Sequence, residues 1–113
     1  MRLKHPVFLE LEFDPLVPEQ IIAGGAATAD LELAASTDRA ETAGFWSCTP
    51  GTFSDVEVRE SFLVIAGRAT ISYEDGRSFE LASGSIHQFA GGERTVWTVH
   101  EKLVKAYWIA ELA

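Results

Sequence analysis

The chain has 113 residues, of which 47% are hydrophobic and 23% charged, a composition typical of one folded domain and not of a disordered segment. Nine Lys and Arg against seventeen Asp and Glu leave a net charge of −8, which repels phosphate backbones and argues against a nucleic-acid partner. No apolar run is long enough to cross a bilayer, and the N-terminus lacks the apolar segment of a signal peptide, so we expect a soluble, cytoplasmic protein without membrane contacts. The single cysteine, Cys48, excludes an internal disulfide.

The first third of the chain carries one strand pattern and one segment that is hard to interpret. In residues 6–13, apolar and polar side chains alternate with the two-residue period of a half-buried strand, and we expect an edge strand there. Pro15 and Pro18 then interrupt it. Residues 20–42 combine Ala-rich helix propensity with a short strand-like alternation, and we interpret them as a loop with short extended pieces.

From Gly44 onward, short apolar runs alternate with turn signals, which is typical of a β-sandwich or barrel. The predicted strands are residues 45–49, 61–66, 69–73, 78–81, 85–89, 95–99 and 104–109. Gly67 is expected to end the second strand, and Asp75-Gly76 predicts a tight hairpin. Gly91-Gly92 is expected to turn the chain so that residues 95–99 return antiparallel to residues 85–89. The sequence therefore predicts one all-β domain, with a barrel core in residues 44–113 and an N-terminal strand and arm in residues 1–43 that completes the barrel or a dimer.

Two spacings stand out within this core. Glu60 is followed after six residues by Gly67, and Gly84 is followed by Gly92. In order and spacing they resemble the two motifs of the cupin superfamily, although Ala90 stands where the second motif usually has proline. More narrowly, residues 44–109 are similar to the small single-domain, RmlC-like cupins that include the ureidoglycine aminohydrolase-like family. The matching positions are Gly44 to Gly51, Glu60, Gly67, Asp75-Gly76, Gly84, Trp97 and Lys105-Ala106-Tyr107. The resemblance implies a double-stranded β-helix, or jelly-roll, barrel and a homodimer.

The resemblance also implies a metal centre, built from two histidines separated by one residue, a glutamate and a later histidine, which suits Mn, Fe, Ni or Zn. The corresponding positions of this chain hold no histidine: they are Ser54 and Val56, or Phe53 and Asp55, for the pair, and Thr95 for the later ligand. Carboxylates at Asp55 and Glu60 alone would hold a transition metal weakly, so we expect no tightly bound metal and no other cofactor. The alternative is a displaced divalent-metal site in which His87, across the predicted hairpin from Thr95, joins Glu60.

Glu60 is the candidate catalytic residue. Strand alternation places it on the same face as Phe62 and Val64, inside the barrel, where a carboxyl group could act as a general acid or base. The competing interpretation is a structural ion pair with Arg59, Arg68 or Lys105, because such pairs are also found away from active sites.

Seven residues are predicted to contact a ligand: Trp46, Glu60, His87, Thr95, Trp97, Lys105 and Tyr107. Alternation places Thr95 with Trp97, and Lys105 with Tyr107, on inward faces, so that the aromatic rings could stack on a planar ligand and the ammonium could attract a carboxylate. The aromatic residues could equally form plain core, and His87 could simply be hydrogen-bonded to the backbone. Cys48 is interpreted as a buried structural thiol, because no neighbouring histidine would activate it.

These observations lead to three hypotheses for function. The first is a small cupin that binds a small polar metabolite in the barrel, with a degenerate metal site. The second is an aminohydrolase-like or isomerase-like enzyme acting on a ureide, an amide or a sugar-type molecule, in which Glu60 transfers protons and Lys105 or Tyr107 orients the substrate. The third is an interaction protein that forms a homodimer through the apolar face of Leu63 and Ile65 together with the first predicted strand.

Overall fold

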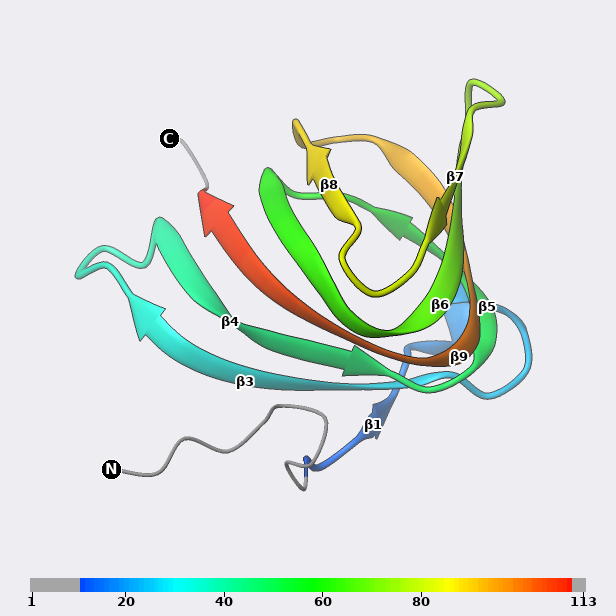
Figure 1. The fold of residues 1–113 in the computed structure, drawn as a ribbon, viewed down its shortest axis with the longest axis horizontal. Coiled ribbons are helices and arrows are strands. Elements are labelled where there is room, and N and C mark those ends of the chain that lie inside the picture. Colours follow the sequence, from blue (N-terminus) through cyan, green and yellow to red (C-terminus); the bar gives the residue numbers. More distant parts are fainter. Residues whose placement is uncertain (1–10, 111–113) are drawn as a thin grey trace.

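The protein is described by a computed structural model that places residues 11–110, and its regular structure is almost entirely β (Figure 1). The elements are β1 (Asp14–Pro15), the 3-10 turn η2 (Pro18–Gln20), β2 (Ile21–Ala23), β3 (Ala27–Ala35), β4 (Glu41–Cys48), β5 (Gly51–Val56), β6 (Glu60–Tyr73), β7 (Ser78–Leu81), β8 (Ile86–Phe89) and β9 (Arg94–Ala110). No helix in residues 11–110 has the length and apolar character to cross a membrane.

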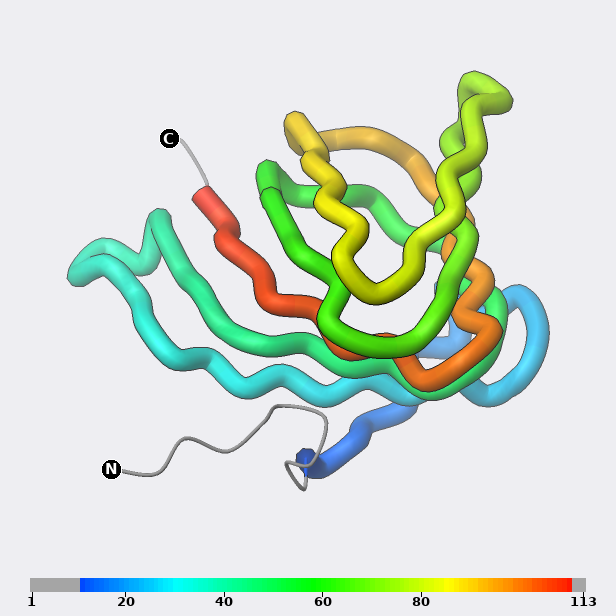
Figure 2. The backbone as a smooth tube through the Cα atoms, in the orientation of Figure 1, coloured from blue at the N-terminus to red at the C-terminus, as the bar shows by residue number. Residues whose placement is uncertain are grey.

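The strands form one antiparallel sheet that curls around a shared interior (Figures 1 and 2). The strand order along the main path is β1-β3-β4-β9-β5-β2, and β6 pairs with β7, β8 and β9. Strand β9 organises this arrangement. Its first half pairs with β5, its second half pairs with β4, and β6 runs along nearly its whole length. The expected all-β barrel of curled strands is confirmed.

The sequence predicted a strand that ends at Gly67. In the structure this strand, β6, continues past Gly67 to Tyr73. The glycine adopts φ +93°, and the pairing of β6 with β9 shifts register on both sides of it. A Cβ atom at Gly67 would lie 2.1 Å from the carbonyl oxygen of Lys102. The glycine therefore bends β6 as a bulge while the strand continues, which lets β6 and β9 turn the corner of the barrel together.

The two predicted hairpins have different outcomes. The Asp75-Gly76 hairpin is confirmed, because β6 and β7 pair from Ala69 with Leu81 to Ser72 with Ser78. The predicted hairpin of residues 85–89 with residues 95–99 is wrong, because β8 pairs with the start of β6 instead. The predicted strands 95–99 and 104–109 are both parts of β9.

The N-terminal third differs most from the prediction. Residues 20–42 are not mainly loop, since they contain the nine-residue strand β3, which pairs with β4. Strand β5, directly after the Pro50-Gly51 turn, was not predicted at all. Most of the predicted edge strand 6–13 lies outside the described residues, and residues 11–13 are not in a strand. Pairing with neighbouring strands decides the secondary structure of these segments, because their local strand propensity is weak.

One hydrophobic cluster fills the interior: Ala26, Cys48, Phe53, Phe62, Val64, Ala69, Ile71, Leu81, Phe89, Trp97, Val99, Leu103 and Tyr107. Burial raises the pKa of the Cys48 thiol to about 12, and its Sγ lies 3.3 Å from the carbonyl oxygen of Thr49. The thiol is therefore a weak nucleophile at neutral pH, as expected for a structural cysteine. Leu63 and Ile65, the proposed dimer face, are half-buried in the single chain, and the homodimer stays a prediction that sedimentation would test.

Replacing Gly67 with Ala should destabilise the protein by about 2 kcal/mol or more beyond the cost of the same change at Gly76. Of these two glycines, only Gly67 lies where an added Cβ atom would collide with neighbouring backbone. Both glycines have positive φ, +93° and +97°, so the comparison isolates the collision with Lys102 from the backbone strain. Urea denaturation of the two variants measures the difference. Equal losses of stability would contradict the assigned role of Gly67.

Candidate functional site

A cavity of about 220 Å³ lies inside the curled sheet, where β3, β4, β5, β6 and β9 meet. Its walls combine acidic, aromatic and aliphatic side chains with one lysine: Asp30, Trp46, Phe53, Asp55, Val56, Glu57, Val58, Glu60, Trp97, Lys105, Tyr107 and Ile109. A concave site of this kind, apolar with a few convergent polar groups, is typical of small-molecule binding.

The central polar contact of the cavity is an ion pair between Glu60 at the start of β6 and Lys105 on β9. The Oε2 atom of Glu60 lies 2.8 Å from Nζ of Lys105, and the two side chains are only 6% and 7% exposed. The structural ion pair considered for Glu60 is therefore present, and of the three candidate partners it is Lys105 that forms it. Because both groups also line the cavity, the pairing does not exclude contact with a ligand.

Aromatic rings surround the Lys105 ammonium group. Its Nζ atom lies 4.3 Å from the ring centre of Phe62, 4.6 Å from that of Trp46 and 5.1 Å from that of Trp97. The negative faces of these rings attract a cation, and the attraction grows as water is removed. The lysine head group is therefore fixed in place by one carboxylate and three aromatic rings.

Glu57 is a second buried acid in the cavity, 6% exposed. Its Oε2 atom accepts hydrogen bonds from Thr95 Oγ1 at 2.5 Å and from the Trp97 indole at 2.9 Å. Burial raises the pKa of Glu57, and these two hydrogen bonds partly oppose the shift. Burial also raises the pKa of Asp55, against the hydrogen bond from the backbone of Val56 and the charge of Lys105.

The third polar contact joins Tyr107 on β9 to Asp30 on β3. The phenol donates to Oδ1 of Asp30 at 2.6 Å, and burial together with this contact raises the pKa of Tyr107. Tyr107 is therefore a neutral phenol at physiological pH. Among the described residues, the cavity thus carries four carboxyl groups and a single ammonium group.

The donors present do not fit the metal centre that the resemblance implies. In residues 11–110, no group of three or more His, Cys, Asp or Glu side chains is arranged to hold a metal ion. The positions that correspond to the usual histidine ligands hold no imidazole: they are Ser54 and Val56, or Phe53 and Asp55, together with Thr95, and the hydroxyl of Thr95 is already bound to Glu57.

His87 lies in a different place from the other predicted ligand-binding residues. Its Nε2 atom is 2.7 Å from the hydroxyl of Tyr73, and its ring contacts the rings of Phe62, Phe79 and Phe89. Burial lowers the pKa of His87. Because β8 pairs with β6, the hairpin that would have carried His87 across to Thr95 is absent, and His87 is not among the described residues that line the cavity.

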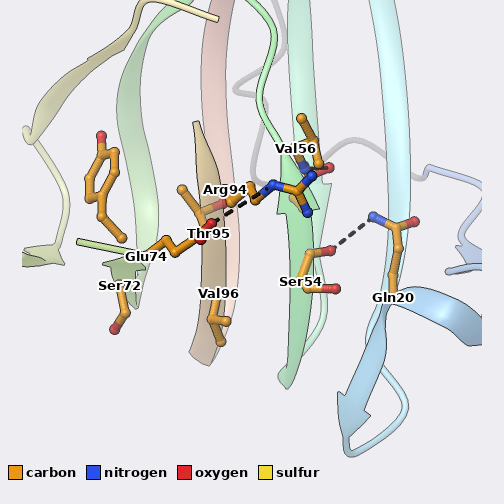
Figure 3. Close-up of a pocket in the computed structure, with 10 residues that line it drawn as sticks. Gln20, Ser54, Val56, Ser72, Glu74, Arg94, Thr95 and Val96 are labelled. Atoms are coloured by element: carbon orange, nitrogen blue, oxygen red, sulfur yellow. Dashed lines mark hydrogen bonds and ion pairs between the residues drawn. The ribbon is translucent and has the colours of Figure 1, made fainter. Parts of the chain in front are cut away.

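A larger hollow, of about 510 Å³, crosses the ends of β5, β9 and β6 beside the η2 turn (Figure 3). Nε of Arg94 lies 3.8 Å from Oε2 of Glu74, and Nε2 of Gln20 donates to the carbonyl oxygen of Ser54 at 3.1 Å. Figure 3 shows both contacts. Both members of the Arg94–Glu74 pair are more than 70% exposed, and water screens such pairs strongly. The smaller cavity, with its buried charges, is therefore the better candidate site.

Five of the seven predicted ligand-binding residues line this cavity, namely Trp46, Glu60, Trp97, Lys105 and Tyr107, and Thr95 supports it through Glu57. Glu57 and Asp30 were missed as site residues. Asp30 lies on β3, in the segment interpreted as loop. Glu57 directly follows β5, and the alternation of Phe53, Asp55 and Glu57 would have indicated an inward-facing acid if that strand had been recognised.

Removing the Glu60 carboxylate should leave the Lys105 ammonium buried without a partner. We expect Glu60→Ala to cost about 3–5 kcal/mol of stability, and the double change Glu60→Leu with Lys105→Met to restore most of that loss. The matched control is Glu101→Ala, which breaks the exposed pair of Glu101 with Arg68 and should cost no more than about 1 kcal/mol. Equal effects of the two Ala substitutions, measured by urea denaturation, would show that the Glu60 pair behaves as a surface contact.

The pH dependence of stability should report on Glu57. Since its pKa is raised in the folded state, the folded protein binds this proton more tightly than the unfolded chain. The contribution of Glu57 is therefore most favourable at acid pH, and it is lost as pH rises from the ordinary glutamate pKa through the raised one. Glu57→Gln cannot ionise and its amide oxygen can still accept both hydrogen bonds, so its stability relative to wild type should increase across that window. Denaturation at a series of pH values measures this, and a constant difference would contradict it.

Comparison with known proteins agrees with this fold. Residues 35–107 match the family model for the EutQ-like cupin domain. No curated protein matches the chain.

Three solved structures illustrate the likeness. A DUF861-family protein of unknown function from Pseudomonas syringae pv. tomato superposes with a TM-score of 0.80 at 24% identity, covering 91% of this chain and 45% of that one. This chain thus spans less than half of that relative. The EutQ protein of Clostridium difficile gives 0.65 at 17% identity over 76% of this chain and 69% of that chain. The Cnp3 cupin domain of Schizosaccharomyces pombe gives 0.63 at 12% identity over 75% and 65%.

At these identities the structures show a shared fold and no more. The family model, in contrast, covers more than half of the chain, including β4 to β8 and the part of β9 that carries Lys105. The chain therefore belongs to the family of EutQ-like cupin domains.

Proposed function

We propose that this cupin binds a small polar metabolite in the cavity between β3, β4, β5, β6 and β9. The observation that carries the proposal is the Glu60–Lys105 pair, which is almost completely buried and yet lines an open space. Two charges withdrawn from water cost several kcal/mol each, and a buried pair is weak evidence for added stability. A pair kept in this position is better accounted for by ligand binding, because both side chains line the cavity.

The chemistry of the walls supports a particular kind of ligand. The cavity is lined by four carboxyl groups and one ammonium group, and that ammonium is already bound by Glu60. The expectation that Lys105 attracts a carboxylate is therefore less favoured than a ligand that brings hydrogen-bond donors of its own. Trp46, Trp97 and Tyr107 supply flat apolar surface for the rest of the molecule.

The second candidate is an enzyme, and it is favoured by the direct contact of Glu60 with Lys105 in the cavity. A carboxyl group and an amine at 2.8 Å can exchange a proton, and general acid–base catalysis needs such a group within reach of the substrate. An aminohydrolase-like or isomerase-like reaction on a ureide, an amide or a sugar-type molecule would then use Glu60 for proton transfer, with Lys105 or Tyr107 orienting the substrate. The resemblance to ureidoglycine aminohydrolase-like cupins supports this alternative.

A panel of small amines, ureides, amides, polyols and carboxylates, tested for thermal stabilisation and by calorimetry, examines the binding proposal. We expect neutral or cationic compounds with hydrogen-bond donors to bind, and Glu60→Gln to weaken binding about tenfold or more, as loss of a charged hydrogen bond does. The control Glu101→Gln changes an exposed acid and should leave the affinity unchanged. An unchanged affinity in the Glu60→Gln variant would show that the ligand does not contact Glu60, and would contradict the proposed site.

The same variants separate binder from enzyme. If any ureide, amide or sugar is turned over by the wild-type protein, and Glu60→Gln abolishes turnover but still binds the compound, the enzymatic alternative is supported. Binding without turnover of any compound in the panel leaves the metabolite-binding proposal.

A further inference from the structure

We propose that Lys105 captures a small neutral aldehyde as a reversible covalent imine. The inference rests on the proposed function in one respect, since it requires that small molecules enter the cavity. It goes beyond that function because it assigns a bond-forming step to a particular atom, Nζ of Lys105.

The surroundings of Lys105 carry the inference. A lysine becomes a nucleophile toward carbonyl compounds when a neighbouring base takes a proton from its ammonium group. Lys105 has such a base, because Oε2 of Glu60 lies 2.8 Å from its Nζ atom, and its side chain is only 7% exposed. It also lines the cavity, so a molecule inside can reach the nitrogen.

Glu60 supplies the proton acceptor that the reaction needs. The ammonium form of Lys105 first gives a proton to Glu60 Oε2 across 2.8 Å, which leaves a neutral amine beside a neutral acid. The amine lone pair then attacks the carbonyl carbon and forms a C–N bond, while the C=O π electrons move to oxygen. Glu60 protonates that oxygen, and its carboxylate then takes a proton back from the positively charged nitrogen, which gives a neutral carbinolamine. Glu60 next protonates the hydroxyl group, which leaves as water while the nitrogen lone pair forms the C=N bond. The products are one imine, protonated or neutral, and one water.

The charge of the cavity selects the carbonyl compound. Asp30, Asp55 and Glu57 line the same space as the Glu60–Lys105 pair, so an anionic oxo acid would meet an excess of negative charge. A neutral hydroxyaldehyde would not be repelled, and its hydroxyl group could donate to a free carboxylate oxygen. The cavity volume of about 220 Å³ suits molecules of a few carbon atoms.

Reductive trapping tests the inference. Wild-type protein is incubated with glycolaldehyde and sodium cyanoborohydride, which reduces an imine to a stable secondary amine, and the modified lysines are located by peptide mass spectrometry. We expect Lys105 to be labelled at least about tenfold faster than the exposed Lys102, whose rate in the same molecule is the internal reference, and glyoxylate of similar size to label Lys105 at least about tenfold more slowly than glycolaldehyde.

Three variants sharpen the result. Lys105→Arg keeps the charge and should remove the fast labelling, whereas Lys102→Arg should leave it unchanged. Glu60→Gln should slow labelling of Lys105 about a hundredfold, as loss of a general acid–base group does, while Lys102 in the same variant keeps its rate. Circular dichroism verifies that each variant is folded, and the comparison of Lys105 with Lys102 in wild type stands even if a variant fails to fold.

Labelling of Lys105 no faster than that of Lys102 would overturn the inference, and so would equal labelling by glyoxylate and glycolaldehyde. The first result, together with donor-bearing compounds that bind in the calorimetric panel, would refute the imine while the proposed binding function stands. The absence of both labelling and binding would refute both.

Discussion

The structure depends on how the charges of Glu60 and Lys105 are accommodated inside a curled sheet. The pair lies between the two longest strands, β6 and β9, which also carry the largest share of the interior. Neither charge could stay buried alone, so the position of each strand is constrained by the other. The aromatic rings of Trp46, Phe62 and Trp97 complete the arrangement, because they surround the ammonium without competing for the carboxylate.

The sequence predicted those parts of the fold and site that depend on regular alternation in long strands. Every second residue from Glu60 to Val64 is buried, as is every second residue from Thr95 to Val99, so the inward faces could be assigned without knowing which strands pair. The inward direction of Glu60 and Lys105 followed from the same two-residue period. The Asp-Gly hairpin was equally predictable, because its conformation depends on local backbone preferences.

Pairing between distant segments could not be predicted in the same way. Strand β3 is rich in Ala and acidic residues, and it is a strand because β4 pairs with it. Residues 86–89 look like one half of a hairpin with residues 95–99, yet they pair with the start of β6, far earlier in the chain. Asp30 lies on β3 and Glu57 directly follows β5, and neither strand was predicted from the sequence. For this reason the acidic character of the site was underestimated.

A single strand, β9, supplies both Trp97 and Lys105 to the cavity, and the barrel corner lies between these two residues along the strand. Inserting or deleting one residue in that interval would turn Lys105 toward the outside, since a strand's side chains change face with each residue. The spacing of eight positions is therefore a fixed length in the protein's architecture. The Ser36–Ala40 turn carries no such restriction, because it lies outside the cavity and joins two strands at their open end. Divergence in chain length among cupins of this shape should accumulate in such turns and spare the corner.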